Sequence, residues 1–182
     1  MPEIIALILG TAANLGFSWR ALRAPGGHGF YRFFAWEAIL CLLILNHEPW
    51  GKDPYSPHQF ASWLLMLLSI ALVFYGARQL VRSGRAAEER GDPTLYEFEK
   101  TTQLVTSGIY RYIRHPMYTS LLALAWAAYL QDPNLIGTLI AAVATLSLLL
   151  TALADEKECL AYFGAEYEAY MRRTRRFIPG LF

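Results

Sequence analysis

Two polar segments of the sequence combine residue types that could bind a charged ligand or move a proton. The first, residues 94–118, contains His115 and Pro116 just before an apolar run. Imidazole titrates near neutral pH, and the free backbone N–H groups at a helix start can hold an anionic or polar ligand. The second segment, residues 155–182, opens with the adjacent acids Asp155 and Glu156. These groups are the candidates for proton transfer and for ligand binding.

The acidic pair stands at the C-terminal end of a long apolar run, where carboxylates are unfavourable. The partial negative charge of a helix C-terminus destabilises each of them by about 0.3 to 1 kcal/mol. We therefore expect a cationic partner, either the basic cluster at residues 172–176 or a cationic ligand. After the pair, aromatic residues recur at helical spacing, which predicts one amphipathic interfacial helix, or two short helices broken at Gly164. The predicted face comprises Cys159, Tyr162, Phe163, Glu166, Tyr167 and Tyr170.

Composition places these segments on a membrane protein. Hydrophobic residues make up 55% of the 182 residues and charged residues 17%, and the mean hydropathy is +0.27. A soluble domain has about 25% charged residues, so this chain has too few charges for a water-exposed surface. Long apolar runs predict an all-α, polytopic membrane helix bundle with about five transmembrane helices. The predicted spans are residues 4–19, 33–45, 60–77, 117–130 and 135–154.

The basic residues predict the orientation of the bundle. Short cytoplasmic loops collect Lys and Arg, and with the N-terminus outside every basic residue except Lys52 falls on the cytoplasmic side. The chain is predicted to be N-out and C-in, with its site facing the cytoplasm, in a bacterial inner membrane or alternatively the endoplasmic reticulum. We expect a single domain with three N-terminal spans at residues 1–81, a cytoplasmic loop at 82–116, a helical hairpin at 117–154 and a cytoplasmic tail at 155–182.

The hairpin is predicted from the short polar connection between the fourth and fifth spans. Asp132 can cap the following helix and Pro133 can occupy its first turn. Small residues recur along the fifth span and permit close helix packing in lipid. Within the second span, Glu37 is an intramembrane acid that either contacts a substrate or pairs with Arg32 or another helix.

Two kinds of partner are not supported by the residues. A net charge of +1 gives no overall field to hold nucleic acid. The two cysteines, Cys41 and Cys159, match neither a disulfide framework nor a CxxC metal spacing, and the four histidines are scattered. We therefore expect neither a nucleic-acid partner nor a metal. The patterns carry no prediction of oligomeric state.

The two polar segments together resemble a known family. Residues 104–118 read LVTSGIYRYIRHPMY, residues 155–170 read DEKECLAYFGAEYEAY, and RRFIP follows at 175–179. This pair of motifs, separated by a hydrophobic hairpin, resembles the signature of the isoprenylcysteine carboxyl methyltransferases and related phospholipid methyltransferases. The resemblance covers the C-terminal part of the chain. It implies an integral-membrane methyltransferase that uses S-adenosyl-L-methionine, with a cofactor pocket built by the cytoplasmic ends of the last helices and the C-terminal segment.

The resemblance also implies roles for individual residues. Glu156 and His115 are the candidate catalytic residues, as general bases where the acceptor must lose a proton. Arg114 and Glu37 are candidates for substrate binding. The implied cofactor contacts fall on Thr102, Gln103, Leu104, Val105, Tyr110, His115, Pro116, Met117, Tyr118, Asp155, Glu156 and Tyr167. A histidine can take the methionine carboxylate, an acid can take the ammonium or ribose hydroxyls, and tyrosines can line the adenine and the sulfonium.

The expected reaction transfers the sulfonium methyl group to a lipophilic acceptor from the bilayer, either an isoprenylcysteine-type carboxylate or another small hydrophobic molecule. Isoprenylcysteine members of the family place an arginine about one turn before the acidic pair, where this chain has Thr151 and Ala152. Asp155 also stands where the family pattern has a glutamate. Two alternatives stay open, namely a phospholipid or amine N-methyltransferase and a non-catalytic membrane protein for binding or assembly.

Overall fold

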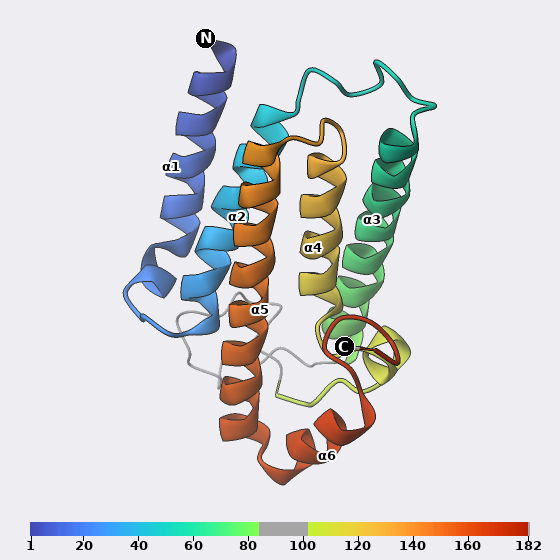
Figure 1. Ribbon diagram of the computed structural model, residues 1–182. Coiled ribbons are helices and arrows are strands. Elements are labelled where there is room, and N and C mark those ends of the chain that lie inside the picture. The colour runs from blue at the N-terminus through green and yellow to red at the C-terminus, as the bar shows by residue number, and fades with distance from the viewer. Residues whose placement is uncertain (84–101, 182) are drawn as a thin grey trace.

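The computed structural model describes residues 1–83 and 102–181. Within these ranges the chain forms six α-helices and one short 3₁₀ helix. They are α1 (Pro2–Leu22), α2 (His28–Leu45), α3 (Pro57–Ser83), η1 (Gly108–Arg111), α4 (Pro116–Tyr129), α5 (Leu135–Phe163) and α6 (Ala165–Arg173). Helices α1 to α5 form one bundle in which successive helices run in opposite directions, and α6 lies across one end (Figure 1). The predicted all-helical bundle is confirmed.

Four of these helices are long and apolar enough to cross a membrane, which identifies the chain as an integral membrane protein. They are α1, α2, α3 and α5. Helix α4 forms at the predicted fourth span but has only 14 residues. That length is about 21 Å, against roughly 30 Å for the hydrocarbon core of a bilayer. Half of the residues of α4 are buried, and it packs against α2, α3 and α5. It is therefore the most enclosed helix of the bundle.

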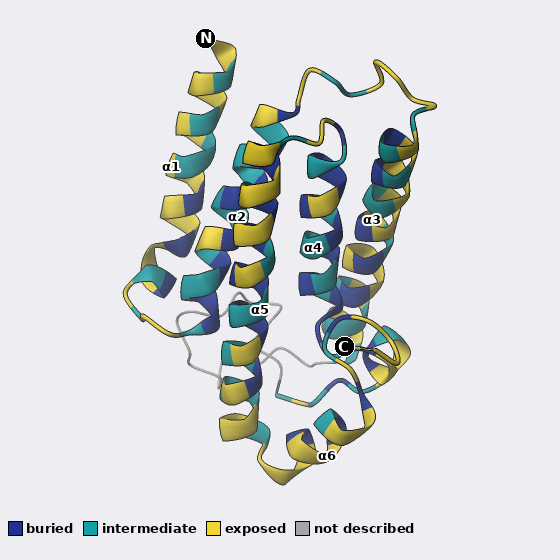
Figure 2. Cartoon of the chain, viewed as in Figure 1, coloured by how far each residue is buried: buried dark blue, intermediate teal, exposed yellow. Residues whose placement is uncertain are grey.

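Small residues form the contact surfaces between the central helices. On α5, Gly137, Ala141, Ala144 and Ser147 recur every three to four residues along one buried face, and alanines predominate on the buried face of α4. In Figure 2 the side of α5 toward the viewer is mostly exposed, and buried segments are seen on α2, α3 and α4. Small side chains let helix backbones approach closely, which is the main source of packing energy where lipid removes the hydrophobic drive. The small residues predicted for helix packing are thus confirmed in this role.

The connection between α4 and α5 differs from its prediction by a few residues. The N-cap of α5 is Asn134, whose side-chain oxygen accepts a hydrogen bond from the backbone N–H of Gly137 at 2.8 Å. The assignment of Asp132 as the cap and Pro133 as the first helical residue was wrong. Asparagine and aspartate are nearly equivalent as caps, so Asp132 and Asn134, two residues apart, left the start of the helix ambiguous.

Both motif segments lie at the same end of the bundle, together with the loop between α1 and α2 (Figure 1). The N-terminus, the loop after α2 and the turn between α4 and α5 lie at the opposite end. The alternation agrees with the predicted grouping of basic segments on one side. Part of the predicted polar segment, residues 84–101, lies outside the described residues.

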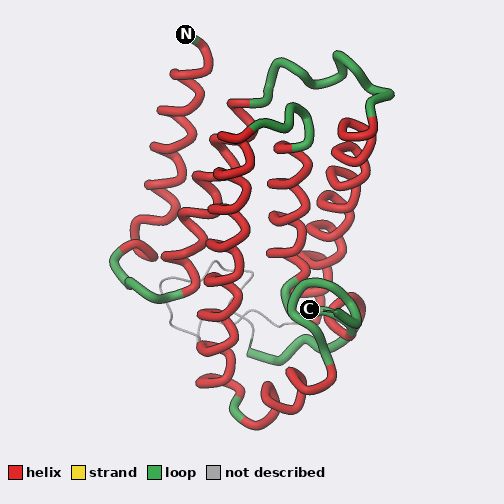
Figure 3. The backbone as a smooth tube through the Cα atoms, viewed as in Figure 1, coloured by secondary structure: helices red, strands yellow, loops and turns green. Residues whose placement is uncertain are grey.

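Helix α5 continues past the predicted end of its span. Its 29 residues extend about 43 Å, so that its last turns, which carry Asp155 and Glu156, project beyond a hydrocarbon core of about 30 Å. The helix ends at Gly164, after which the chain turns sharply into α6 (Figure 3). The predicted break at Gly164 is confirmed, but the predicted aromatic face is not continuous. Tyr167 is buried whereas Tyr162 is 47% exposed, because the turn reorients α6.

The backbone conformation at Gly164 favours glycine at this position, and a substitution can test this. Its φ of 58° and ψ of −131° lie in a region that is open almost only to glycine. Gly164→Ala should therefore lower the free energy of unfolding by about 1 to 3 kcal/mol, measured as a lower thermal unfolding temperature in detergent. The matched control is Gly16→Ala. A Cβ atom meets nothing within 4 Å at either position, but Gly16 has an ordinary helical backbone. Equal unfolding temperatures for the two variants would contradict the backbone argument.

Candidate functional site

His115 is held at the start of α4 on the end of the bundle that carries both motifs. It is the N-cap residue of α4, and Pro116 begins the helix as predicted. The imidazole is buried, 5% exposed, and stacks on the ring of Tyr118 with centroids 5.3 Å apart and planes inclined by 18°. The ring of Phe177 lies 6.2 Å away on the C-terminal segment. The ring is thus fixed by aromatic contacts in one orientation.

Glu156 is the centre of a buried ionic cluster. Its Oε1 accepts hydrogen bonds from Nε and Nη2 of Arg114, each at 2.8 Å, and lies 3.3 Å from Nε2 of His115. Arg176 donates to the same oxygen from Nε at 3.1 Å and to Oε2 from Nη2 at 2.7 Å. The Glu156 side chain is only 5% exposed. The expected cationic partner of the acidic pair therefore exists within the chain, and Arg176 of the basic cluster supplies part of it.

Arg114 connects this cluster to the C-terminal segment. Its Nη1 donates to the backbone carbonyl of Thr174 at 2.6 Å and to that of Met171 at 3.3 Å. The backbone of the segment also runs beside residues 112–115, since the N–H of Arg114 donates to the carbonyl of Arg175 at 2.8 Å. Residues 174–177 thus cover the cluster.

Asp155 differs from Glu156 in exposure and in partners. Its Oδ2 lies 3.4 Å from Nδ1 of His115, and its Oδ1 accepts a weak hydrogen bond from the Cys159 thiol at 3.5 Å. The Asp155 side chain is 22% exposed, against 5% for Glu156. Of the two adjacent acids, Asp155 is therefore the one accessible to a ligand.

The two carboxylates set the protonation of His115. Burial on its own lowers the pKa of a histidine, but hydrogen bonds to Asp155 and Glu156 outweigh it and raise the pKa of His115 above its ordinary value of 6.5. The imidazole therefore stays positively charged to higher pH than a free histidine. In this state both ring nitrogens are donors, one toward each carboxylate.

The raised pKa predicts a pH-dependent stability. Protonated His115 stabilises the folded state fully below about pH 6.5, and this contribution is lost as the pH rises through the raised pKa. His115→Gln cannot titrate, so its thermal unfolding temperature in detergent should lack this component of the decline above neutral pH. His47→Gln is the control, because His47 is 48% exposed and follows α2 at the opposite end. Parallel pH profiles for wild type and His115→Gln would refute the assignment.

His28 and Glu158 join the start of α2 to the last turns of α5. One carboxylate oxygen of Glu158 accepts from the backbone N–H of His28 at 3.0 Å, and the other lies 2.5 Å from Nδ1 of the buried imidazole. An anion at this position offsets the partial positive charge of the α2 N-terminus. His28, Glu158 and Asp155 each place one ligand atom within 4.8 Å of the others, a spacing that a metal ion would also tolerate. The hydrogen bonds between His28 and Glu158 give this group a structural role without an ion.

The remaining predicted cofactor contacts surround the cluster to different degrees. Tyr110 is buried in η1, where its carbonyl accepts a hydrogen bond from the hydroxyl of Tyr170 at 2.7 Å. Tyr167 is also buried, which raises the pKa of its phenol and keeps the hydroxyl protonated. In the loop before η1, Val105 is buried, and Thr102, Gln103 and Leu104 are more exposed.

Three candidate residues have structural contacts of their own. Met117 packs closely against Gly76 of α3. A Cβ atom added to that glycine would lie only 3.3 Å from Sδ of Met117. Glu37 accepts hydrogen bonds from Thr11 at 3.0 Å and Asn14 at 2.7 Å, so it joins α2 to α1, as the expected pairing with another helix requires. Arg114 directs its guanidinium into the ionic cluster.

Several residues of the site were not among the candidates drawn from the sequence. Arg176 was expected only as a member of the basic cluster at residues 172–176, and Phe177 belongs to the RRFIP stretch that the resemblance had marked, so a signal existed for both. Glu158 and His28 had none, because they are 130 residues apart and neither lies in a spacing that suggests pairing.

Fold and site together define a class of protein: an integral-membrane helix bundle with a buried cationic histidine and an acidic pair at one end. The model of the phospholipid methyltransferase family matches residues 58–165, which is more than half of the chain. The chain therefore belongs to the phospholipid methyltransferase family. The matched region runs from α3 through α5 and contains both His115 and Glu156. Membership of this family implies a methyl donor.

Individual relatives are methanethiol S-methyltransferases from bacteria. The chain is similar to methanethiol S-methyltransferase 2 of Bradyrhizobium diazoefficiens, with 29% identity over 159 residues that cover 79% of this chain and 56% of the relative. Methanethiol S-methyltransferase 1 of the same organism is 27% identical over 81% of this chain and 49% of its own length. The enzyme of Pseudomonas sp. strain GM41(2012) is 22% identical over 81% and 54%. The chain thus spans about half the length of the curated relatives that it matches. No solved structure matches it.

Proposed function

We propose that this protein transfers a methyl group from S-adenosyl-L-methionine to a small apolar acceptor, with a thiol as the first candidate. The observation that carries the proposal is the cluster of His115, Asp155 and Glu156 at the motif-bearing end of a bundle that belongs to a methyltransferase family. The relatives act on methanethiol by name, which favours a thiol. The bacterial origin of the relatives and the grouping of basic segments support an N-out, C-in chain in a bacterial inner membrane.

The residues of the site fit the charges of the proposed methyl donor. Its amino-acid end carries an ammonium and a carboxylate, and the site offers both complementary charges side by side. The partly exposed carboxylate of Asp155 would bind the ammonium or the ribose hydroxyls, and the protonated imidazole of His115, whose two N–H groups face Asp155 and Glu156, would hold Asp155 in position and add positive charge near the donor's carboxylate. Tyr118 and Tyr167, which lie at the edge of this site, would contact the adenine and the sulfonium. When bound, the sulfonium supplies an electrophilic methyl group.

Glu156 has a positioning role in this proposal. Both of its oxygens are occupied by the guanidinium groups of Arg114 and Arg176, and it is therefore a poor proton acceptor. His115 is kept protonated by the same carboxylates and is also a poor base. An amine that has attacked the methyl group must still lose a proton, whereas a thiol can ionise to solvent first; its thiolate then forms the new C–S bond as the methyl–sulfonium bond breaks and S-adenosylhomocysteine leaves. The protonation of the site thus favours a sulfur nucleophile.

The position one turn before the acidic pair argues against an acceptor with a carboxylate. Thr151 is fully buried and its hydroxyl donates to the carbonyl of Ser147 at 2.7 Å, while Ala152 is packed in the core with Tyr118 and Phe177. Neither residue can neutralise an anion. A prenylcysteine carboxylate would therefore lack its expected partner here.

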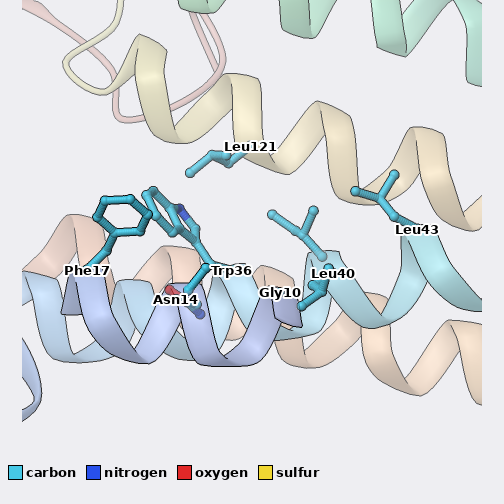
Figure 4. Close-up of a pocket in the computed structure, with 9 residues that line it drawn as sticks. Gly10, Asn14, Phe17, Trp36, Leu40, Leu43 and Leu121 are labelled. Atoms are coloured by element: carbon cyan, nitrogen blue, oxygen red, sulfur yellow. The ribbon is translucent and has the colours of Figure 1, made fainter. Parts of the chain in front are cut away.

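An apolar pocket offers a route for the acceptor from the bilayer. It has a volume of about 320 Å³ and lies between α1, α2 and α4. Figure 4 shows Phe17 and Trp36 at one end of the pocket, Leu43 toward the other, and Leu121 above it. Leu121 stands one helical turn after Tyr118, which stacks on His115. An apolar thiol that enters between α1 and α2 would therefore be directed toward the site.

Narrowing this pocket should weaken use of the acceptor and leave the methyl donor unaffected. Ala13 lines the pocket on α1, so Ala13→Trp should raise the KM for the acceptor by about tenfold, the loss of roughly 1.4 kcal/mol of binding. Ala12→Trp, on the neighbouring exposed position, is the control. An equal rise in KM for both variants would contradict the route.

The proposal is tested with purified protein in detergent and in lipid. Titration with S-adenosyl-L-methionine should show saturable binding, and a labelled methyl group should then appear on a short alkanethiol but not on prenylcysteine. Lack of cofactor binding in both media would overturn the enzyme proposal and leave a non-catalytic membrane protein. Label on phosphatidylethanolamine instead of the thiol would support the second candidate, a phospholipid N-methyltransferase, which the description of the family favours.

A further inference from the structure

A second pocket of polar character lies at the motif-bearing end, apart from the ionic cluster. It has a volume of about 390 Å³ and is lined by residues of the loop around η1 and of the C-terminal end of α6. The lining residues are Thr106, Arg111, Tyr170, Arg173 and Thr174. None of them is among the residues proposed to hold the methyl donor. The pocket presents two guanidinium groups and three hydroxyl-bearing side chains, but no carboxylate.

The two arginines of this pocket have no acidic partner among the described residues, unlike Arg114, Arg172 and Arg176. Among the described residues, Arg114 and Arg176 pair with Glu156, and Arg172 pairs with Glu168 at 2.8 Å. Arg111 and Arg173 form no ion pair within the same described ranges. The guanidinium of Arg173 lies over the ring of Tyr170, 5.9 Å from its centroid. Two positive charges thus face one polar cavity without compensation.

The wall between the two arginines is rigid. Tyr170 and Thr174 are each 2% exposed. The hydroxyl of Tyr170 donates to the carbonyl of Tyr110 at 2.7 Å, and that of Thr174 donates to the carbonyl of Tyr170 at 2.7 Å. These bonds connect η1 to α6, so the spacing of the pocket is set before any ligand arrives. Preorganisation of this kind lowers the entropic cost of binding.

We infer that this pocket binds a phosphate group, carried by the headgroup of a membrane phospholipid. Guanidinium groups match phosphate oxygens in geometry and charge, and the hydroxyl of Thr106 can donate a further hydrogen bond. The pocket lies at the end of the bundle where α3 and α5 leave the predicted membrane (Figure 1), which is the level of the headgroups. A phospholipid bound there would hold η1 and α6 together from the membrane side.

The inference is tested by replacing the two free arginines. In the double variant Arg111→Gln/Arg173→Gln, affinity for short-chain phosphatidylglycerol, measured by calorimetry on the purified full chain, should fall by about tenfold or more. The matched control is Arg20→Gln/Arg172→Gln, which removes the same charge from the same end of the bundle outside the pocket. The control should bind the lipid as the wild type does.

A parallel titration with glycerol 3-phosphate identifies the source of the phosphate. Weak binding of this soluble probe that is lost in the pocket variant supports recognition of the phosphate, provided that the phospholipid also binds. Binding of the soluble probe alone would overturn the assignment to a lipid, and equal losses in both double variants would overturn the pocket. Binding of S-adenosyl-L-methionine should be unchanged in the pocket variant, which separates this inference from the proposed function.

Discussion

Glu156→Gln is expected to abolish detectable cofactor binding and methyl transfer while the transmembrane helices remain folded. The substitution removes the one negative charge that Arg114 and Arg176 share, and leaves two guanidinium groups and a protonated His115 close together. Breaking a buried ion pair by loss of one partner costs about 3 to 5 kcal/mol. If that cost falls on the ligand-binding conformation, affinity drops by more than about a hundredfold. Titration with S-adenosyl-L-methionine and the labelled-methyl assay measure the loss.

Glu168→Gln is the matched control for this prediction. Glu168 also pairs with an arginine, Arg172 at 2.8 Å, but the two side chains are 62% and 66% exposed. An exposed pair of this type contributes only about 0.3 to 0.5 kcal/mol, so cofactor binding should be unaffected. Circular dichroism of both variants should show the helical content of the wild type. Retention of full cofactor affinity in Glu156→Gln would sink the proposed organisation of the site.

A chain that ends at Thr174 should lose cofactor binding as completely as Glu156→Gln. The deleted residues include Arg176, which donates two hydrogen bonds to Glu156, and Phe177, which is 5% exposed against the core and contacts His115. The deletion also removes the backbone partner of the Arg114 N–H. Loss of a buried phenylalanine side chain alone costs about 3 to 5 kcal/mol. Helices α1 to α5 pack on one another without this segment, so the truncated chain should still insert and remain helical.

A chain that ends at Gly180 provides the control for the truncation. It keeps Arg176 and Phe177 and removes only Leu181, which is 77% exposed, and the final residue. Its cofactor affinity should equal that of the full chain. Equal affinity for the chain that ends at Thr174 would show that the C-terminal segment does not complete the site. Loss of affinity in the control as well would point to a general effect of shortening the chain.

Local patterns in the sequence were sufficient for the helices and their order. All five apolar runs became helices, because burial in lipid requires each segment to satisfy its own backbone hydrogen bonds, but α2, α3 and α5 extend beyond the predicted spans into polar sequence. The break at Gly164 was one of the two alternatives drawn from the sequence, and α4 begins at Pro116, one residue before the predicted span, since glycine and proline restrict the backbone locally. The N-cap of α5 was misplaced because Asp132 and Asn134, two residues apart, are similar as caps.

Charge pairing within the site was only partly predictable. The adjacent acids indicated a missing cation, and residues 172–176 were one of two candidates. The structure adds Arg114 as a second cation and divides the acids into an enclosed Glu156 and a partly exposed Asp155. This division follows from the rotation of α5, which turns one carboxylate into the cluster and leaves the other toward its rim. The sequence alone, in which the two acids are neighbours, does not predict which of them is enclosed and which is exposed.

The sequence by itself determined a membrane helix bundle, the grouping of its basic segments and the two motifs of the phospholipid methyltransferase family. Those properties can be predicted from the sequence because hydropathy and charge are sums over residues, and the motifs are defined by residues close together in the chain. Only the tertiary structure decided that Glu156 pairs with Arg114 across 42 residues and that Glu158 meets His28 across 130. Such contacts depend on how the helices pack and rotate against one another. Small residues at helix interfaces are compatible with many packing arrangements, and only the packing of all the helices together determines which one forms.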